Sequence, residues 1–174
     1  MKTRTGVRLA VASGLMMAVA VAMAGPKGPT IVDVAVAVNS EGDYAGEFEL
    51  LIYALGAADP AVVETLSGNG QHTVFAPINS AFEDIDLFTT NDIANLPQDF
   101  LTDVLVYHVA KGRRDSEQVL DSTRIRTLSS DFLLQDGGVL TDNLDRDANI
   151  IVVDVPAANG IIHVIDAVVL PYLP

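Results

Sequence analysis

The chain contains no cysteine among its 174 residues, and this absence excludes several classes of site. Disulfide bonds, thiolate zinc sites, iron–sulfur clusters and cysteine nucleophiles all require that residue. Basic residues are also scarce, because 10 Lys and Arg stand against 23 Asp and Glu and give a formal charge of −13. A surface of that sign repels phosphate backbones, so nucleic acid is excluded as an expected partner.

The N-terminal segment has the three-part order of a secretory signal peptide. Lys2, Arg4 and Arg8 form a basic start, an apolar run covers residues 9–21, and Ala-Met-Ala at residues 22–24 is a small-x-small cleavage site. The apolar run is shorter than the roughly 20 residues that a bilayer span needs, which makes an uncleaved membrane anchor the weaker alternative. We therefore expect the product to be secreted or periplasmic, with no stable membrane span after cleavage.

Removal of the signal peptide, residues 1–24, takes three of the 10 basic residues and none of the 23 acidic ones, so the formal charge falls from −13 to −16. Residues 25–29 are rich in Gly and Pro and are predicted to be a short flexible N-terminus. The whole chain is 49% hydrophobic and 19% charged, which suits one packed globular domain. We place this domain at residues 30–171.

Hydrophobic residues at helical spacing dominate the first half of the domain. They and the capping residues predict helices over residues 48–55, 59–67, 100–108 and 115–120. Lys111 and Gly112 are expected to end the third of these helices. Residues 30–38 stay undecided, because Thr30 and Asp33 have capping-box spacing while the valines of the same segment alternate as in a strand.

Strand-forming residues dominate the second half. A short strand over 73–75 is closed by Pro77, and Gly-, Asn- and Asp-rich turns separate the later runs. These β-rich runs cover residues 124–128, 132–135, 139–141, 150–155 and 161–170. Helices followed by strands predict an α+β fold with a mostly antiparallel sheet or wedge.

Three sequence blocks occur in order at residues 73–82, 104–109 and 159–171. The blocks read TVFAPINSAF, VLVYHV and NGIIHVIDAVVLP, and together they resemble the fasciclin domain, with its two sequence signatures and its Tyr-His motif between them. The similarity spans residues 30–171. It implies an α+β fasciclin-like fold, with helices followed by a mostly antiparallel β-wedge or sandwich, and it implies a helix at residues 31–38.

The resemblance also assigns structural roles to residues of these motifs. They are Thr73, Phe75, Pro77, Asn79, Phe82, Asn159, Gly160, His163 and Asp166. Ile78 stands where the family usually has Thr or Ser, so Asn79 becomes the expected capping acceptor for the turn that follows it.

The candidate partner-binding residues are Tyr107, His108 and Tyr44. In fasciclin-like domains the Tyr-His pair is discussed both as a core element and as part of a partner-binding surface. His108 continues the apolar face of its helix and is expected in the core with a polar partner. Tyr107 is about 100° further around the helix, so it is expected near the boundary with its hydroxyl within reach of water or a partner. Tyr44 lies in an acidic insertion, residues 39–47, which is either a contact surface or a tolerated solvent loop.

Metal-binding patterns are weak in this sequence. The three histidines, His72, His108 and His163, have no H-x-x-x-H spacing that would place two ligands on one helix. Residues 143–154 carry acidic and amide side chains at positions 1, 3, 5, 7 and 12 of a calcium-loop count, but Ala148 replaces the glycine of the sharp turn. An Asp- and Asn-rich hairpin turn explains the same residues, and weak calcium binding is the lesser alternative. We predict no metal and no cofactor.

Catalytic motifs are absent as well. Ser80 and His108 could form a hydrolase triad with Asp84 or Asp103 on residue types alone, but the sequence has no G-x-S-x-G, H-E-x-x-H or phosphate-binding loop. The resemblance instead implies a non-catalytic adhesion or matrix-interaction module, whose partner is a protein or polysaccharide of the cell envelope or matrix, with weak self-association through an apolar patch. A small-ligand carrier for lipid or pigment is the alternative, because some fasciclin-like proteins resemble such binders. A hydrolase is the third hypothesis.

Overall fold

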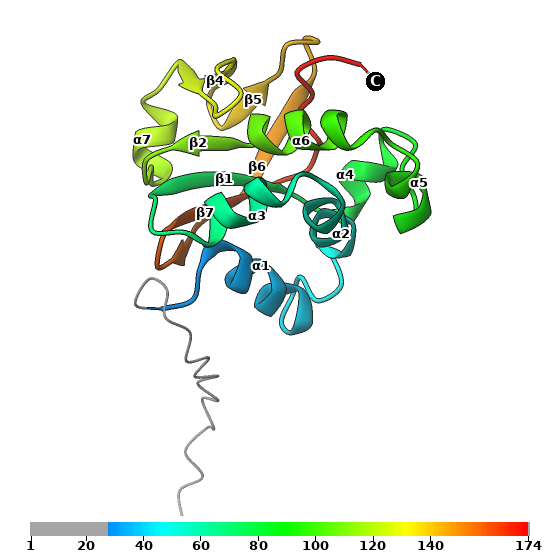
Figure 1. The fold of residues 1–174 in the computed structure, drawn as a ribbon. Coiled ribbons are helices and arrows are strands. Elements are labelled where there is room, and N and C mark those ends of the chain that lie inside the picture. Colours follow the sequence, from blue (N-terminus) through cyan, green and yellow to red (C-terminus); the bar gives the residue numbers. More distant parts are fainter. Residues whose placement is uncertain (1–27, 174) are drawn as a thin grey trace, which may run out of the picture.

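The computed structural model describes residues 28–173, in which helices precede and flank a single sheet (Figure 1). The predicted signal peptide lies outside the described residues. The helices are α1 (Ile31–Ser40), α2 (Glu49–Ala57), α3 (Pro60–Ser67), α4 (Asn79–Glu83), α5 (Thr90–Ala94), α6 (Gln98–Tyr107) and α7 (Ser116–Leu120). The strands are β1 (His72–Pro77), β2 (Val109–Lys111), β3 (Arg124–Arg126), β4 (Phe132–Asp136), β5 (Val139–Thr141), β6 (Asp147–Ala157) and β7 (Gly160–Ile165).

The helix starts follow from capping residues that the sequence displays. Thr30 and Asp33 form a reciprocal capping box at the start of α1, so the undecided segment is a helix. Asp59 accepts a hydrogen bond from the backbone N–H of Ala61 at 2.8 Å, and Pro60 opens α3. Asp115 forms the third predicted start, that of α7.

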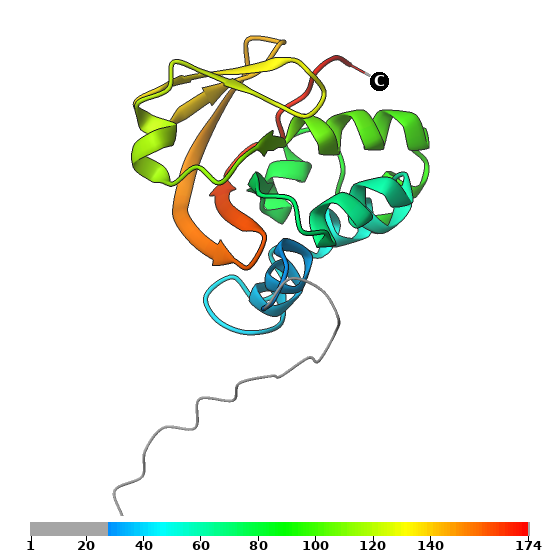
Figure 2. The same cartoon turned by 60° about the vertical axis from the view of Figure 1, so that its left-hand side comes forward.

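The strands form one sheet in the order β2-β1-β7-β6-β5-β4-β3. Every pairing is antiparallel except that of β1 with β7, so the sheet is mixed and mostly antiparallel, as predicted. An antiparallel bridge between Ala110 and Thr127 brings the two outermost strands, β2 and β3, together. The sheet therefore closes on itself as a wedge, which Figure 2 shows beside the helices.

Several predicted bounds differ from the structure, and two of the differences affect the region around the end of α6. The helix α6 ends at Tyr107 and not at Lys111-Gly112, because Val109 already pairs with Val74 of β1 as part of β2. The last strand ends at Ile165 and not at Leu170. Residues 168–170 are buried, but they run across the end of α6 without pairing to a strand.

The interior holds two hydrophobic clusters. The helical core lies between the helices and one side of β1 and β7, and Leu51, Leu101 and Ile162 belong to it. The wedge core lies inside the curved sheet and includes Phe75 and Tyr107. Because side chains alternate along a strand, β1 contributes Val74 and Ala76 to the first cluster and Phe75 to the second.

No single helix within residues 28–173 is both long and apolar enough to cross a membrane. The helices α2 and α3 reach that length and composition only as a pair, across a bend of 116°.

Candidate functional site

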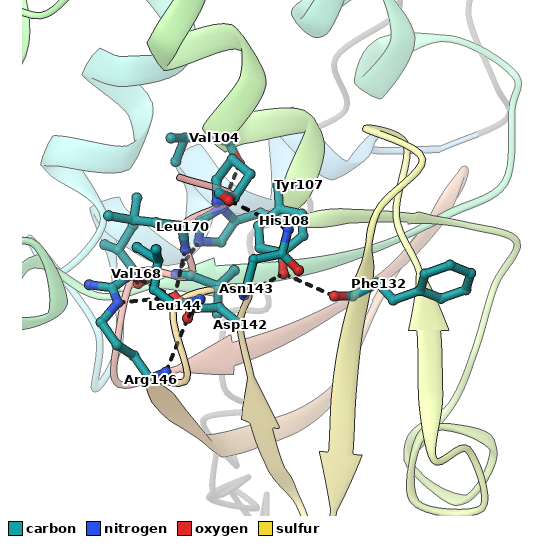
Figure 3. Close-up of polar contacts among 12 residues, drawn as sticks. Val104, Tyr107, His108, Phe132, Asp142, Asn143, Leu144, Arg146, Val168 and Leu170 are labelled. Carbon is teal, nitrogen blue, oxygen red and sulfur yellow. Dashed lines mark hydrogen bonds and ion pairs between the residues drawn. The ribbon is translucent and has the colours of Figure 1, made fainter. Parts of the chain in front are cut away.

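The end of α6 and the turn between β5 and β6 form a polar cluster where the two cores meet (Figure 3). Tyr107 has no exposed surface, and its hydroxyl donates to the carbonyl of Phe132 at 3.0 Å and accepts from the backbone N–H of Asn143 at 3.2 Å. Burial raises the pKa of Tyr107 to about 12. The predicted boundary position is therefore wrong, because β4 and the turn between β5 and β6 cover the face of α6 that the helix alone would leave open.

His108 is buried, as its place on the apolar face predicts, and both ring nitrogens have partners. Its Nδ1–H donates to the carbonyl of Val104 at 2.8 Å, and its Nε2 accepts from the backbone N–H of Val169 at 3.2 Å. Burial lowers the pKa of His108 to about 4, because a charged imidazole would lose its hydration there. The ring is neutral at pH 7 and holds residues 168–170 against the end of α6.

Asp142 and Arg146 complete this cluster. The Asp142 carboxylate is fully buried, and the Arg146 guanidinium binds it through Nε at 3.1 Å and Nη2 at 2.7 Å. The same carboxylate accepts backbone N–H bonds from Leu144 at 2.8 Å, Arg146 at 3.1 Å and Leu170 at 2.9 Å. Arg146 also donates to the carbonyl of Val168 at 2.9 Å. A buried carboxylate is costly unless it is paired and hydrogen-bonded, and five donors meet that requirement here.

Our sequence analysis missed the Asp142–Arg146 pair. The available signal was an Asp followed four residues later by an Arg, but Asp142 precedes the segment 143–154 of the calcium-loop count, and Arg146 stands at a position that the count does not use. Nothing local in that spacing shows that the carboxylate also accepts from Leu170, which is 28 residues further along the chain.

Another histidine, His163, lies on β7 in register with Phe75 of β1. His163 is fully buried, its ring stacks on Phe75 with 5.8 Å between centroids, and its Nε2–H donates to the carbonyl of Arg114 at 2.9 Å. Its Nδ1 accepts from the backbone N–H of Asp154 at 3.3 Å. The three histidines are thus dispersed, and among residues 28–173 no three His, Asp or Glu side chains are placed to share a metal ion.

Comparison with known proteins identifies the family of this domain. The family model described as the fasciclin domain matches residues 46–171. The chain belongs to the fasciclin domain family. It is 40% identical over 129 residues to protein sll1483 of Synechocystis, an alignment that covers 71% of this chain and 67% of the relative.

Two further comparisons connect the chain to animal proteins. It is 35% identical over 133 residues to the pig transforming growth factor-beta-induced protein ig-h3, covering 71% of this chain and 18% of that protein. Its fold is similar to a solved FAS1 domain pair from the insect cell adhesion molecule fasciclin I, with a TM-score of 0.56 and 21% identity over 70% of this chain and 45% of the other.

The fasciclin motif residues of the first block hold different parts of the domain together. The Thr73 hydroxyl donates to the carbonyl of Gly112 at 2.7 Å and accepts from the Arg114 N–H at 2.8 Å. Phe75 and Phe82 are buried in the wedge core and the helical core, respectively. Pro77 ends β1 opposite Ile165.

Asn79 caps a helix, but a different one from the helix we predicted. Its Oδ1 accepts from the backbone N–H of Leu50 in the first turn of α2 at 3.1 Å, and its Nδ2 donates to the carbonyl of Gly46 at 2.6 Å. Its own helix, α4, begins at Asn79, and the N-cap residue Ile78 provides no side-chain cap. The side chain of Asn79 turns toward α2 because the insertion, which ends at residue 47, lies directly beside it.

The second signature begins with Asn159 and Gly160 at the turn between β6 and β7. The buried Asn159 accepts from the Ile31 N–H at 2.8 Å and donates to the carbonyls of Leu66 at 2.6 Å and Gly68 at 2.9 Å. A Cβ on Gly160 would collide with the His72 carbonyl oxygen. This signature therefore fixes α1, α3 and β1 at one point.

Asp166, also in the second signature, accepts two hydrogen bonds from Asn149. Its two carboxylate oxygens accept from the backbone N–H of Asn149 at 2.7 Å and from its amide at 2.8 Å. Asp154 accepts instead from the hydroxyl and N–H of Ser116. Two side chains of the supposed calcium loop, Asn149 and Asp154, are thus used in separate structural bonds.

Tyr44 lies apart from the Tyr107–His108 cluster. It is half-buried in the insertion, with its ring 6.2 Å from that of Phe48, and it packs against the helical core. Asn39, at the start of the insertion, accepts from the Phe48 N–H at 2.8 Å and anchors the loop to the start of α2. The structure therefore does not bring the three predicted partner-binding residues together.

A groove of about 260 Å³ lies between α3 and α6 and is floored by Val109 and Leu128. Its walls are mostly aliphatic, with Val62 and Leu66 on one side and Val106 on the other. Asp59, Thr65 and Thr102 add polar atoms to its lining, and no basic residue lines it.

Proposed function

We propose that the chain is a secreted or periplasmic, non-catalytic module that works in adhesion or matrix interaction. The observation that carries this proposal is the complete internal bonding of the Tyr107–His108 pair. A general base needs a ring nitrogen free to take a proton, and both nitrogens of His108 are engaged within the fold. Recognition through the outer surface needs no such group.

The Tyr-His pair acts indirectly in this proposal. Tyr107 fixes Phe132 at the start of β4, and His108 fixes the buried Val169, so both residues hold neighbouring segments in place without meeting a partner. Tyr44 is the candidate for direct contact, because its loop is mostly exposed and loops carry binding residues more often than the elements they connect.

Binding to envelope material tests the adhesive function. The mature chain is incubated with washed cell envelope and, separately, with polymer isolated from the culture medium of the producing cell. The fraction of the protein that stays bound is then measured. We expect saturable retention that Tyr44→Ser weakens severalfold and that Tyr53→Ser, an exposed tyrosine on α2, leaves unchanged. Retention no greater than that of an unrelated acidic protein of equal charge would contradict the proposal.

Catalytic screening tests the proposal that the module is non-catalytic. We expect no turnover of a broad panel of ester and glycoside substrates above buffer. Turnover that His108→Gln abolishes, while the variant remains folded, would establish the hydrolase hypothesis instead.

The groove between α3 and α6 favours a second candidate, a carrier of a small apolar ligand. Its size suits a small molecule, and the lack of a basic residue in its lining favours a neutral ligand over a fatty acid anion. Nile red fluorescence provides the test. We expect saturable binding that Ala61→Trp blocks by filling the groove, whereas Ala37→Trp, on the exposed side of α1, leaves it unchanged. Equal fluorescence with all three proteins would contradict the carrier function.

A further inference from the structure

Within residues 28–173, positive charge is concentrated in one short segment. Residues 28–110 contain no Lys or Arg and 13 Asp and Glu. Five of the six basic residues in the described part of the chain lie within residues 111–126, and the sixth is Arg146. The helices α2 to α5 all precede this basic segment, and Figure 1 shows α4 and α5 at the opposite end of the molecule from α7 and β4.

Three of these basic side chains share one outer face. Ile125, in the middle of β3, points into the wedge core, so Arg124 and Arg126 point outward and are exposed. The bridge of Ala110 with Thr127, both buried, places Lys111 beside Arg126 across the two strands, with about 5 Å expected between their Cβ atoms. On the other side, Arg126 pairs in register with Phe132 of β4. We call Lys111, Arg124, Arg126 and Phe132 the β3 face.

Among residues 28–173, the cations of the β3 face have no ion-pair partner. The one ion pair within residues 28–173 joins Arg146 to Asp142, so neither Arg124 nor Arg126 has a carboxylate within ion-pair distance. The neighbouring Asp131 carboxylate accepts from Ser129 within the turn between β3 and β4. Like charges directly opposite each other on a sheet are destabilising, so this arrangement gains most when an external anion binds.

Phe132 orients one of the guanidinium groups. The Arg124 Cζ lies 4.0 Å from the centroid of the Phe132 ring, and 37% of the Phe132 surface is exposed. A guanidinium held over an aromatic ring keeps its N–H edge available for two parallel bonds to a carboxylate. Arg124 and Arg126 are about 7 Å apart along the strand, which provides two such positions in a row.

We propose that the β3 face binds an acidic polysaccharide through its carboxylate groups. An extended chain with repeated carboxylates matches a short line of cations on a strand, whereas a stable protein partner buries about 800 Å² on each side, far more than this face of four residues offers. The acidic residues of the distant helices are screened, because the Debye length is about 8 Å at physiological ionic strength. This inference rests on the proposed adhesive function and names its partner class.

Polygalacturonate binding tests the inference, with neutral dextran and polyglutamate as comparison polymers. We expect the mature protein to bind polygalacturonate and to leave dextran unbound, and we expect Arg124→Gln/Arg126→Gln to weaken the binding at least about tenfold, a factor that the loss of one charge-assisted hydrogen bond accounts for. The matched control is Arg113→Gln/Arg114→Gln, which removes the same charge from the same segment. Arg113 donates to the Ala157 carbonyl at 2.9 Å and Arg114 to the Ser122 hydroxyl at 3.5 Å, so these side chains are used within the fold. Cooperative urea unfolding from a native baseline establishes that both double variants are folded, and the control variant is expected to have the lower midpoint because it loses these internal bonds.

Three outcomes would overturn the inference. An equal loss of binding in both double variants would show a general charge effect. Absence of polygalacturonate binding would refute an acidic polysaccharide as the ligand. Polyglutamate binding as tight as polygalacturonate binding would indicate that acidic proteins are the partners. The envelope assay separates this inference from the proposed function. Retention on envelope without polygalacturonate binding leaves adhesion standing and refutes the ligand, whereas polygalacturonate binding without envelope retention refutes adhesion.

Discussion

The two cores of this domain are held by different means. The helical core is filled by aliphatic and aromatic side chains whose helices begin with local caps such as Thr30 and Asp59. The wedge core is smaller, and polar groups border it: the hydroxyl of Tyr107 and the buried carboxylate of Asp142. The stabilisation from hydrophobic burial scales with the buried apolar area, so a small loss of area costs little. A buried polar group that loses its partner, in contrast, costs its full desolvation free energy. We therefore expect single substitutions to damage the wedge core more than the helical core.

Asp142→Ala is expected to have the largest effect on the free energy of unfolding. It removes the acceptor of five hydrogen bonds and the partner of Arg146, so the cost is about 3 kcal/mol or more. Urea unfolding measures it. The matched control, Asp145→Asn, changes an exposed residue of the same turn, whose positive φ asparagine tolerates, and is expected to stay within about 0.5 kcal/mol of wild type. Equal midpoints for Asp142→Ala and wild type would mean that the turn does not stabilise the wedge.

His108→Gln tests the junction between the cores and is expected to cost about 1–3 kcal/mol at pH 7. The pKa of His108 is about 4 in the fold against 6.5 for an ordinary histidine, so the unfolded chain binds a proton that the folded chain refuses between those pH values. Wild-type stability is fully present above pH 6.5 and declines as pH falls toward 4. The variant lacks this titration, so its deficit should narrow over the same range in urea unfolding at several pH values. A deficit that is constant with pH would mean that the ring is not buried in its neutral form.

Tyr107→Phe keeps the ring and removes only the hydroxyl. The Phe132 carbonyl and the Asn143 N–H then lose their partner, which is expected to cost about 1–2 kcal/mol. The control, Tyr172→Phe, removes an exposed hydroxyl that donates to Asp103 and should change the unfolding midpoint little. If the two variants unfold alike, the hydroxyl of Tyr107 contributes no more than a surface group.

Asn79→Ala probes the helical core and is expected to have the smallest effect. It removes the cap on α2 at a cost of about 1 kcal/mol, with Asn91→Ala on the exposed side of α5 as the control. Both are compared by thermal and urea unfolding. A loss for Asn79→Ala as large as that for Asp142→Ala would contradict the difference between the two cores.

The elements that the sequence predicts well are those with local causes. Pro60 after Asp59 fixes the start of α3, and the spacing of apolar residues locates α2 and α6. The segment of α1 satisfied two local patterns equally, and only the resemblance to the fasciclin domain decided it correctly.

The errors arise where distant segments decide. Helical geometry alone places Tyr107 at a boundary. The side chain is buried because β4, which begins 25 residues later, covers that side of α6. Asn79 was expected to cap its own helix, and its partner Leu50 lies 29 residues earlier. Asp142 looks like an ordinary turn residue until Leu170 and Arg146 surround it. Side-chain spacing within one element carries no information about these contacts.

The position of β7 has a consequence for how the chain folds. This last strand lies between β1 and β6, so β1 has only the three-residue β2 beside it until residues 160–165 arrive. Closure of the sheet must therefore bring together segments separated by most of the domain. The chain loses the entropy of closing this loop before the strand pairing contributes stability. Folding should accordingly be slow for a domain of this size, with the helices forming early and the wedge closing in a late step once Asn159 has met the ends of α1 and α3.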